Sequence, residues 1–259
     1  MPPILLNLGC GTRIHPAWQN FDLNVTAPGV RPLDIRAPLP FPDSSADAVY
    51  HSHVLEHLDP HTGARFVREC RRILKPGGVL RIAVPDLEAI CREYLRALDA
   101  AAAGQASAVD DHAWMTIELI DQCTRTTPGG EMLRWWTAPM VASEALVRRR
   151  MGNEFARFRD WFDAETQRAG ARPPWADAPP QTPTIEQEAA FRRQGEIHRW
   201  MYDRISLTAL LKRVGFESDR IKVVSATESA IDAWPTFELD ADAAGNVHKP
   251  DSVFVEAKA

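Results

Sequence analysis

A short apolar run that ends in a glycine turn opens the chain and most constrains its fold. Residues Ile4–Leu8 lead into Gly9-Cys10-Gly11. A continuous apolar run of this length is typical of a parallel strand buried on both faces. The two glycines let the backbone approach a ligand closely, because neither carries a Cβ atom. The opening residues therefore predict an α/β fold with a ligand at the end of the first strand.

Residues 1–96 alternate between short strands and helices. A helical periodicity over residues 66–74 ends at Lys75-Pro-Gly-Gly, which combines a helix breaker with a turn. The next helix follows Asp86, a favourable N-cap residue. This alternation favours a doubly wound parallel sheet. Further strands are expected at Gln19–Leu23, Arg31–Ile35, Asp47–Ser52 and Val79–Val84.

The pattern changes after residue 96 and then returns. An Ala-rich segment over residues 97–108 has high helical propensity, and residues 110–170 show helical patterns without a clear strand. Residues 171–183 are rich in proline and are expected to be extended. Another helical segment is expected over Glu186–Met201.

The tail resumes the alternation of the first hundred residues. A helix closes at Gly215, and apolar runs predict strands at Ile221–Ser225 and Ser252–Ala257. We therefore expect a core formed by residues 1–96 and 203–259, interrupted by a helical insertion of residues 97–202.

Composition excludes several classes of protein. The net charge is −5, from 30 Lys and Arg against 35 Asp and Glu, so a broad positive field for nucleic acid is not expected. No Cys-x-x-Cys pair occurs, which argues against a zinc or redox motif. No signal peptide and no apolar run near the ~20 residues of a membrane span is found, so we expect a cytoplasmic protein without a membrane partner.

The glycine turn discriminates between cofactors. A dinucleotide fold places a third glycine three residues after Gly11 to pack a helix and hold a pyrophosphate, and here that residue is Ile14. A nucleoside without phosphates therefore fits better than a dinucleotide. An ordinary tight turn is the alternative interpretation.

Two acidic residues end the second and third predicted strands. Asp22 is placed to accept hydrogen bonds from both ribose hydroxyls, although it follows Gly11 by too few residues for an intervening helix. The first crossover is therefore expected to be a loop containing Arg13–Trp18. Asp34 can accept from an adenine amino group, and Ile35 can cover the ring. A solvated carboxylate is the alternative interpretation for Asp22.

A histidine-rich motif, His51-Ser-His-Val-Leu-Glu-His-Leu58, follows the fourth strand. With Leu6–Gly11, the two aspartates, Leu39-Pro-Phe41 and Arg72–Gly78, it gives an order of motifs that resembles class I methyltransferases of the type 11 group. The resemblance covers residues 4–86 well and 205–257 more loosely. It implies a Rossmann-like sheet of seven strands in the order 3-2-1-4-5-7-6, with the last strand antiparallel, and S-adenosyl-L-methionine as cofactor.

The resemblance also implies the residues that hold this cofactor. The glycine turn would lie under its methionine and ribose parts, the ends of strands two and three would hold ribose and adenine, and the end of strand four would lie beside the methionine moiety. These residues are Gly9, Cys10, Gly11, Asp22, Leu23, Asp34, Ile35, Ser52 and His53. The short first crossover and the absence of the usual upstream helix depart from the family, so the insertion is expected to act as a lid and to bring the acceptor specificity.

Two histidines are the candidate general bases for an alcohol acceptor. Imidazole titrates near neutral pH, and His53 and His57 follow the fourth strand. His57 as a structural residue at a helix start is the alternative. On one continuous helix, His53, Glu56, His57 and His61 would share a face compatible with a metal ion, but Pro60 is expected to break that helix, so no metal is expected.

The insertion carries the candidate acceptor residues. Arg and Trp can clamp anionic groups and stack on sugars, although at helical spacing they are more often core or solvated residues. The candidates are His112, Arg134, Trp135 and His198. A segment similar to His198–Asp203 occurs in family members that resemble enzymes of glycan or natural-product pathways.

The sequence thus predicts a methyltransferase that moves a methyl group from S-adenosylmethionine to a small-molecule or glycan acceptor, at a hydroxyl oxygen. Because no indispensable catalytic residue stands out, a non-catalytic binding or scaffold protein with the same fold is the main alternative. An NAD-dependent oxidoreductase is a third possibility, disfavoured by the missing glycine.

Overall fold

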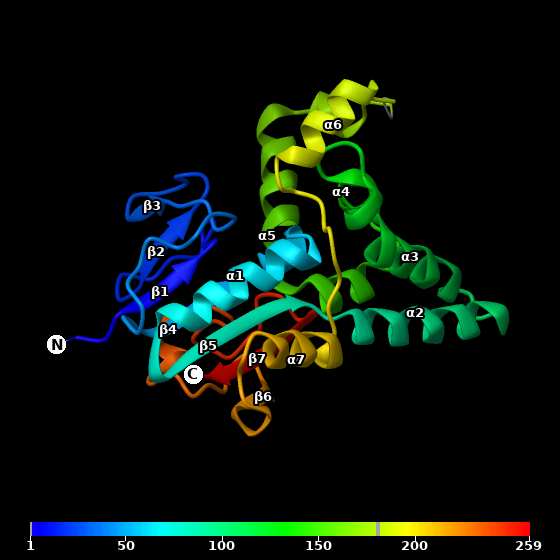
Figure 1. Cartoon of the computed structure of the whole chain (residues 1–259). Helices are drawn as coiled ribbons and strands as arrows, with labels where there is room; N and C mark the ends of the chain where they lie inside the picture. Colours follow the sequence, from blue (N-terminus) through cyan, green and yellow to red (C-terminus); the bar gives the residue numbers. More distant parts are fainter. Residues whose placement is uncertain (1, 180–181) are drawn as a thin grey trace. The chain divides into compact units, whose positions relative to one another are not determined.

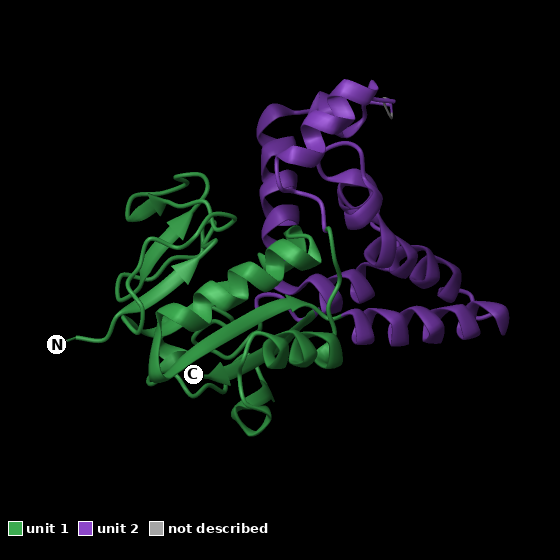
Figure 2. Cartoon of the chain, viewed as in Figure 1, with its two compact units in different colours: residues 1–86, 199–247, 252–259 green, residues 87–198, 248–251 purple. Residues whose placement is uncertain are grey.

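The computed structural model of the chain describes residues 2–179 and 182–259. They form two compact units (Figure 2). Unit 1 comprises residues 1–86, 199–247 and 252–259, and unit 2 comprises residues 87–198 and 248–251. Unit 2, the helical unit, thus begins at Leu87 and also takes in a short piece of the tail.

Unit 1 is built on one seven-stranded sheet with the order β3-β2-β1-β4-β5-β7-β6 (Figure 1). Strand β7 runs antiparallel to both β5 and β6, and the other pairs are parallel. The predicted strand order and the antiparallel last strand are confirmed. The strands are β1 (Leu5–Leu8), β2 (Gln19–Asp22), β3 (Val30–Pro32), β4 (Ala46–Ser52), β5 (Leu74–Pro85), β6 (Ile221–Val224) and β7 (Ser252–Lys258).

One face of this sheet is covered by helices α1 (Pro60–Ile73) and α7 (Arg204–Arg213). Asp59 starts α1, because its carboxylate accepts from the backbone N–H groups of His61 and Thr62, and proline is favoured in the first turn. Gly215 follows α7 with φ +107°, as expected for a glycine that ends a helix. Both helices bury apolar side chains against the sheet: Phe66, Val67, Cys70, Ile73, Leu207, Leu210 and Leu211.

The opposite face is covered by the connection between β6 and β7. Residues 9–18 form no helix, which confirms the predicted loop crossover, and both α-helices described in unit 1 pack on the other face. Trp18 and Tyr50 instead meet Trp234 and Phe237 of the 3-10 turn η4 (Trp234–Phe237) in edge-to-face contacts with centroids 5.2–6.1 Å apart. Residues near the C-terminal end of unit 1 thus bury one face of the strands formed by its N-terminal part.

A buried arginine anchors this connection to the sheet. Arg81 on β5 is fully buried and lies 2.8 Å from carboxylate oxygens of both Asp240 and Glu256. Its remaining donors reach the backbone carbonyl groups of residues 225, 226 and 228, and its guanidinium stacks 4.3 Å from the ring of Trp234. Tyr50 donates to Asp240 at 2.6 Å. Burying a charge this deeply requires such complete pairing.

Two predicted strands differ from the observed ones. The third strand is Val30–Pro32 rather than Arg31–Ile35, because the chain turns at Asp34, which accepts from the backbone N–H groups of Arg36 and Ala37. The fifth strand begins at Leu74 rather than at Val79. Residues 75–78 form a bulge in it, since Ala46 pairs with Leu74 and the pairing resumes with Ala48 and Val79.

Unit 2 is helical throughout its regular part. Its helices are α2 (Leu87–Ala102), α3 (Ala108–Thr124), α4 (Gly130–Thr137), α5 (Glu144–Ala169) and α6 (Ile185–Arg193). The helix predicted over Glu186–Met201 is wrong in its second half, since α6 ends at Arg193 before a turn at Gly195. The proline-rich connector holds one 3-10 turn, Pro174–Ala176, and its residues 180 and 181 lie outside the described residues. No helix in the described ranges is long and apolar enough to cross a membrane.

Candidate functional site

The glycine turn after β1 is held against the neighbouring strands. The N–H groups of Gly9 and Cys10 both donate to the carbonyl of Phe21, at 2.8 and 3.0 Å. Gly9 has φ +70° and faces Val54, whose Cγ2 would lie 2.4 Å from a Cβ at this position. Gly11 has φ +52°, but a Cβ there would meet nothing within 4 Å. The first glycine is therefore required by packing, and the second leaves the backbone open to a ligand.

A buried pair of amides supports the loop that follows this turn. The side chain of Asn7 donates to Asn20 at 3.0 Å and to the carbonyl of Arg13 at 2.9 Å. Asn20 in turn donates to the carbonyl groups of His15 and Trp18. Sequence reasoning missed this pair, although polar residues inside two otherwise apolar strands are a usable signal, because a buried amide needs partners.

Asp22 lies at the end of β2, beside the glycine turn. Its Oδ2 accepts from the backbone N–H of Gly11 at 2.8 Å, and its Oδ1 accepts from Asn24 at 3.1 Å. A carboxylate has about four acceptor positions, so two remain for a ribose. Leu23, the next residue, is half exposed. The structure thus places the predicted ribose-binding carboxylate within hydrogen-bonding distance of the turn.

Asp34 has a different environment from Asp22. It lies two residues beyond β3, where Arg36 contacts both of its oxygens at 2.8 Å. These hydrogen bonds to Arg36 lower the pKa of Asp34, so it stays ionised at neutral pH. Ile35 is partly buried against the core of unit 1. Any adenine amino group at Asp34 would share the carboxylate with Arg36.

His53 is held by two polar partners just beyond Ser52, the last residue of β4. Its Nε2 lies 2.7 Å from the hydroxyl of Ser252, and its Nδ1 lies 3.4 Å from a carboxylate oxygen of Glu56. Glu56 is almost completely buried. The backbone of His53 has φ +53°, and its N–H donates to Ala83 on β5. A left-handed conformation at a residue other than glycine is strained, and such strain concentrates at functional sites.

The four potential metal ligands after β4 do not share a helix face. His53 is left-handed, residues Leu55–His57 form a single 3-10 turn, and α1 begins only at Pro60, with His61 in its first turn. The expected break of the helix at Pro60 is confirmed, because Asp59 and Pro60 start a new helix there. His57 is about a quarter exposed, and its Nε2 lies 4.0 Å from Glu56.

Cys10 lies within the glycine turn and is buried. Burial, together with the nearby charge of Asp22, raises the pKa of its thiol to about 11. The thiol therefore stays protonated at neutral pH and is a poor nucleophile.

The four predicted acceptor residues all belong to unit 2. His112 on α3 packs against Tyr94, with ring centroids 5.1 Å apart. On α4, Arg134 pairs with Glu131 at 3.1 Å, and the indole of Trp135 donates to the carbonyl of Ala142. The backbone of His198, a buried residue, donates to Gln122.

Comparison with known proteins supports a methyltransferase domain. Residues 15–82 match the methyltransferase-domain family. Two relatives, described as probable S-adenosylmethionine-dependent methyltransferases, are 47% identical over 58 residues (Mycolicibacterium smegmatis) and 48% identical over 50 residues (Mycobacterium tuberculosis). These stretches are 21% and 19% of this chain and 22% and 18% of the relatives, so the match spans about a fifth of their length.

The structure is also similar to the solved structure of an S-adenosylmethionine-dependent methyltransferase from Archaeoglobus fulgidus. The alignment covers 99% of this chain and 86% of that protein, with 14% sequence identity and a TM-score of 0.41. The strand order of unit 1 follows directly from its strand pairing. The similarity to the methyltransferase-domain family thus covers residues 15–82, and unit 1 has the strand order expected of a class I, Rossmann-like fold.

Proposed function

We propose that the chain is an active methyltransferase that methylates a hydroxyl oxygen of a small-molecule or glycan acceptor, with His53 as general base. The observation that carries the proposal is the placement of His53 at the end of β4. Its backbone is strained, and its ring is fixed between Glu56 and Ser252. The next residue, Val54, packs on Gly9, so the imidazole belongs to the same edge of the sheet as the glycine turn.

The residues at this edge fit the cofactor. The open backbone at Gly11 gives room for a close approach, and Asp22 keeps free acceptor positions for ribose hydroxyls. The carboxyl ends of parallel strands are where ligands bind in open α/β sheets. When bound, S-adenosylmethionine supplies an electrophilic methyl group on a positively charged sulfur. Gly9, Cys10, Gly11, Leu23, Ile35 and Ser52 are proposed to complete its surroundings.

His53 supplies the proton transfer that an alcohol needs. Its Nε2 accepts the proton of the acceptor hydroxyl, and the nearby carboxylate of Glu56 stabilises the imidazolium that forms. Ser252 holds the ring in position before the acceptor arrives. His57, more exposed and farther from Glu56, is the second candidate for this role.

Unit 2 is proposed to carry the acceptor specificity through His112, Arg134, Trp135 and His198. The aromatic and cationic side chains of this unit suit a sugar or an anionic group. A non-catalytic role remains the competing function. It predicts cofactor binding without turnover and no dependence on His53.

One experiment separates binding from catalysis. Release of S-adenosylhomocysteine is followed over a panel of hydroxylated acceptors, and cofactor affinity is measured by calorimetry. His53→Asn should lower kcat by about 10²–10⁴-fold with the cofactor Kd little changed. Asp22→Ala should weaken cofactor binding by about tenfold to a hundredfold, because hydrogen bonds to a charged group are lost.

Asp232→Ala is the matched control, since Asp232 is exposed in the same unit and its loss changes the net charge equally. It should behave as the wild type in both measurements. Equal kcat in wild type and His53→Asn would refute the general base. Unchanged affinity in Asp22→Ala would refute the cofactor site.

A further inference from the structure

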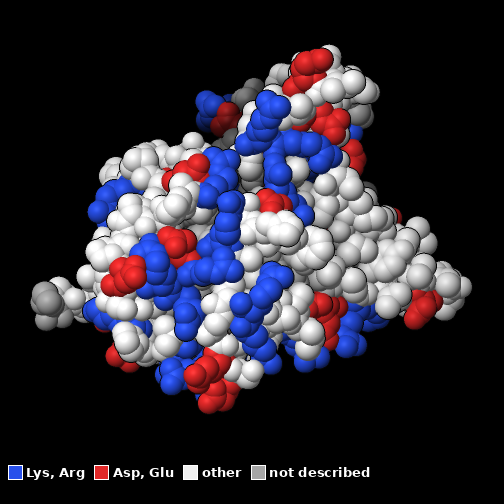
Figure 3. All heavy atoms as spheres, viewed as in Figure 1, with Lys and Arg blue, Asp and Glu red and all other residues white. Residues whose placement is uncertain are grey.

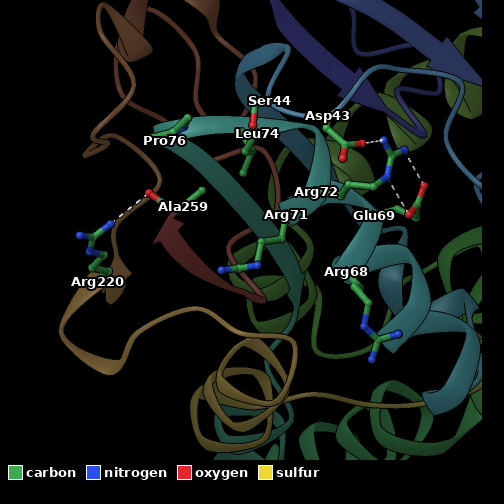
Figure 4. Close-up of a pocket in the computed structure, with 10 residues that line it drawn as sticks. All are labelled: Asp43, Ser44, Arg68, Glu69, Arg71, Arg72, Leu74, Pro76, Arg220 and Ala259. Atoms are coloured by element: carbon green, nitrogen blue, oxygen red, sulfur yellow. Dashed lines mark hydrogen bonds and ion pairs between the residues drawn. The ribbon is translucent and has the colours of Figure 1, made fainter.

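A groove lined by arginines runs along the outer face of α1. Two pockets form it and share Arg68. One, of about 550 Å³, lies near the end of α1, and the other, of about 530 Å³, lies at its start. The first is lined by Asp43, Ser44, Arg68, Glu69, Arg71, Arg72, Leu74, Pro76, Arg220 and Ala259 (Figure 4). The second is lined by Pro60, His61, Ala64, Arg65, Arg68 and Arg213.

The periodicity of α1 creates this face. The helix buries its apolar side against the sheet, so Arg65, Arg68 and Arg72, spaced by three and four residues, line the other side. Its 14 residues span about 21 Å, from the carboxyl edge of the sheet to the opposite edge. The larger pocket therefore lies beside the start of β5, at the edge opposite to the cofactor residues.

Most of these guanidinium groups have no acidic partner. Arg72 is neutralised by Glu69 and Asp43, at 2.7 and 2.6 Å (Figure 4). By contrast, in residues 2–179 and 182–259 no ion pair is formed by any of the four arginines Arg65, Arg68, Arg71 and Arg213. Figure 3 shows the Lys and Arg side chains gathered over this face.

The helices of unit 2 show that this is not how the chain usually places arginine. There, exposed arginines pair with an acid one turn away, as in Arg92 with Glu88 at 2.9 Å and Arg148 with Glu144 at 2.6 Å. The chain has a net charge of −5, yet these arginines are clustered without acidic partners. Their mutual repulsion is unfavourable, and ion pairs with acidic residues would remove it. An anionic ligand would remove the same repulsion.

We propose that this groove is a binding site for a phosphate-bearing ligand, distinct from the cofactor site. The guanidinium fork matches the geometry of phosphate oxygens and donates to two of them at once. Arg71 is pre-positioned for this, because the absence of a side chain at Gly215 lets its guanidinium lie near the end of α7 and 5.8 Å from the ring of Phe216. The pocket volume suits a group larger than a single phosphate.

Binding is tested with inorganic pyrophosphate by calorimetry, and with vesicles of phosphatidylglycerol or phosphatidylcholine by co-sedimentation. The variant is Arg68→Gln/Arg71→Gln. The control, Arg92→Gln/Arg168→Gln, removes two exposed arginines that pair with glutamates in unit 2, with the same change of net charge. Thermal unfolding confirms that both variants fold.

The wild type and the control should bind pyrophosphate or phosphatidylglycerol vesicles, and the groove variant should bind at least about tenfold more weakly, as the loss of two charge-assisted contacts implies. Pyrophosphate binding identifies a soluble ligand, and vesicle binding alone identifies a lipid headgroup. Two results would overturn the proposal: no binding of any probe by the wild type, or equal loss of binding in the groove variant and the control.

Discussion

Gly9 offers a quantitative test of how the cofactor edge is packed. At φ +70°, an alanine would cost about 1–2 kcal/mol from the left-handed backbone alone. Its Cβ would also lie 2.4 Å from Cγ2 of Val54, an overlap that typically costs about 1–3 kcal/mol. Gly9→Ala should therefore destabilise unit 1 by about 2–5 kcal/mol, a large part of the total for most proteins.

Two further variants separate the backbone cost from the steric cost. Gly11 also has a positive φ, but a Cβ at this position would meet no atom within 4 Å, so Gly11→Ala should lower the free energy of unfolding by only about 1–2 kcal/mol. Val54→Ala should lose about 1.5 kcal/mol for its two methyl groups, and in the double variant with Gly9→Ala the clash disappears. The double variant should then be more stable than the sum of its single changes by about 1–3 kcal/mol.

Urea denaturation followed by tryptophan fluorescence gives these values, since Trp18 and Trp234 both lie in the core of unit 1. The free energies of unfolding of the wild type, Gly9→Ala, Val54→Ala and the double variant complete a double-mutant cycle, and Gly11→Ala gives the backbone cost alone. Additivity of Gly9→Ala and Val54→Ala within about 0.5 kcal/mol would refute the contact as the reason for the glycine.

Two further predictions concern buried charge. Arg81→Met should cost about 3–5 kcal/mol in urea denaturation, because Asp240 and Glu256 lose their buried partner, whereas Lys75→Ala, which breaks the exposed pair with Asp47, should cost no more than about 1 kcal/mol. Burial lowers the pKa of His51 to about 3, so below pH 6.5 the unfolded chain binds a proton that the folded state does not, and the free energy of unfolding decreases as the pH falls. Between pH 7 and pH 4 the loss should be about 3 kcal/mol. His51→Leu should remove that part of the pH dependence. A pH dependence identical in wild type and His51→Leu would contradict this.

The positions of the strands were predictable from local sequence patterns, whereas their order came from the resemblance to class I methyltransferases. Short apolar runs, the Gly9 turn and the helix end at Gly215 are properties of neighbouring residues, and the structure confirms them. The ends of the strands were harder to predict. The third strand ends early because Asp34 forms a turn with the N–H groups of Arg36 and Ala37, whereas its apolar neighbours were expected to continue the strand.

The partners of His53 lay beyond sequence reasoning because Ser252 is 199 residues away in the chain. Glu56 follows His53 by three residues, and a 3-10 turn rather than a longer helix connects them. The left-handed backbone at His53, which brings the three side chains together, has no signature in residue type.

The buried attachment of residues 225–247 to the first strands has a consequence for how the chain reaches its native state. Tyr50 finds its partner 190 residues later, and Arg81 finds Glu256 175 residues later. Closing such distant contacts is slow, because the entropy of the intervening chain is lost before the contacts form. During synthesis, the apolar surface around Trp18 and Tyr50 therefore stays uncovered until residues 231–239 have left the ribosome, and this is the interval in which it is most exposed to aggregation.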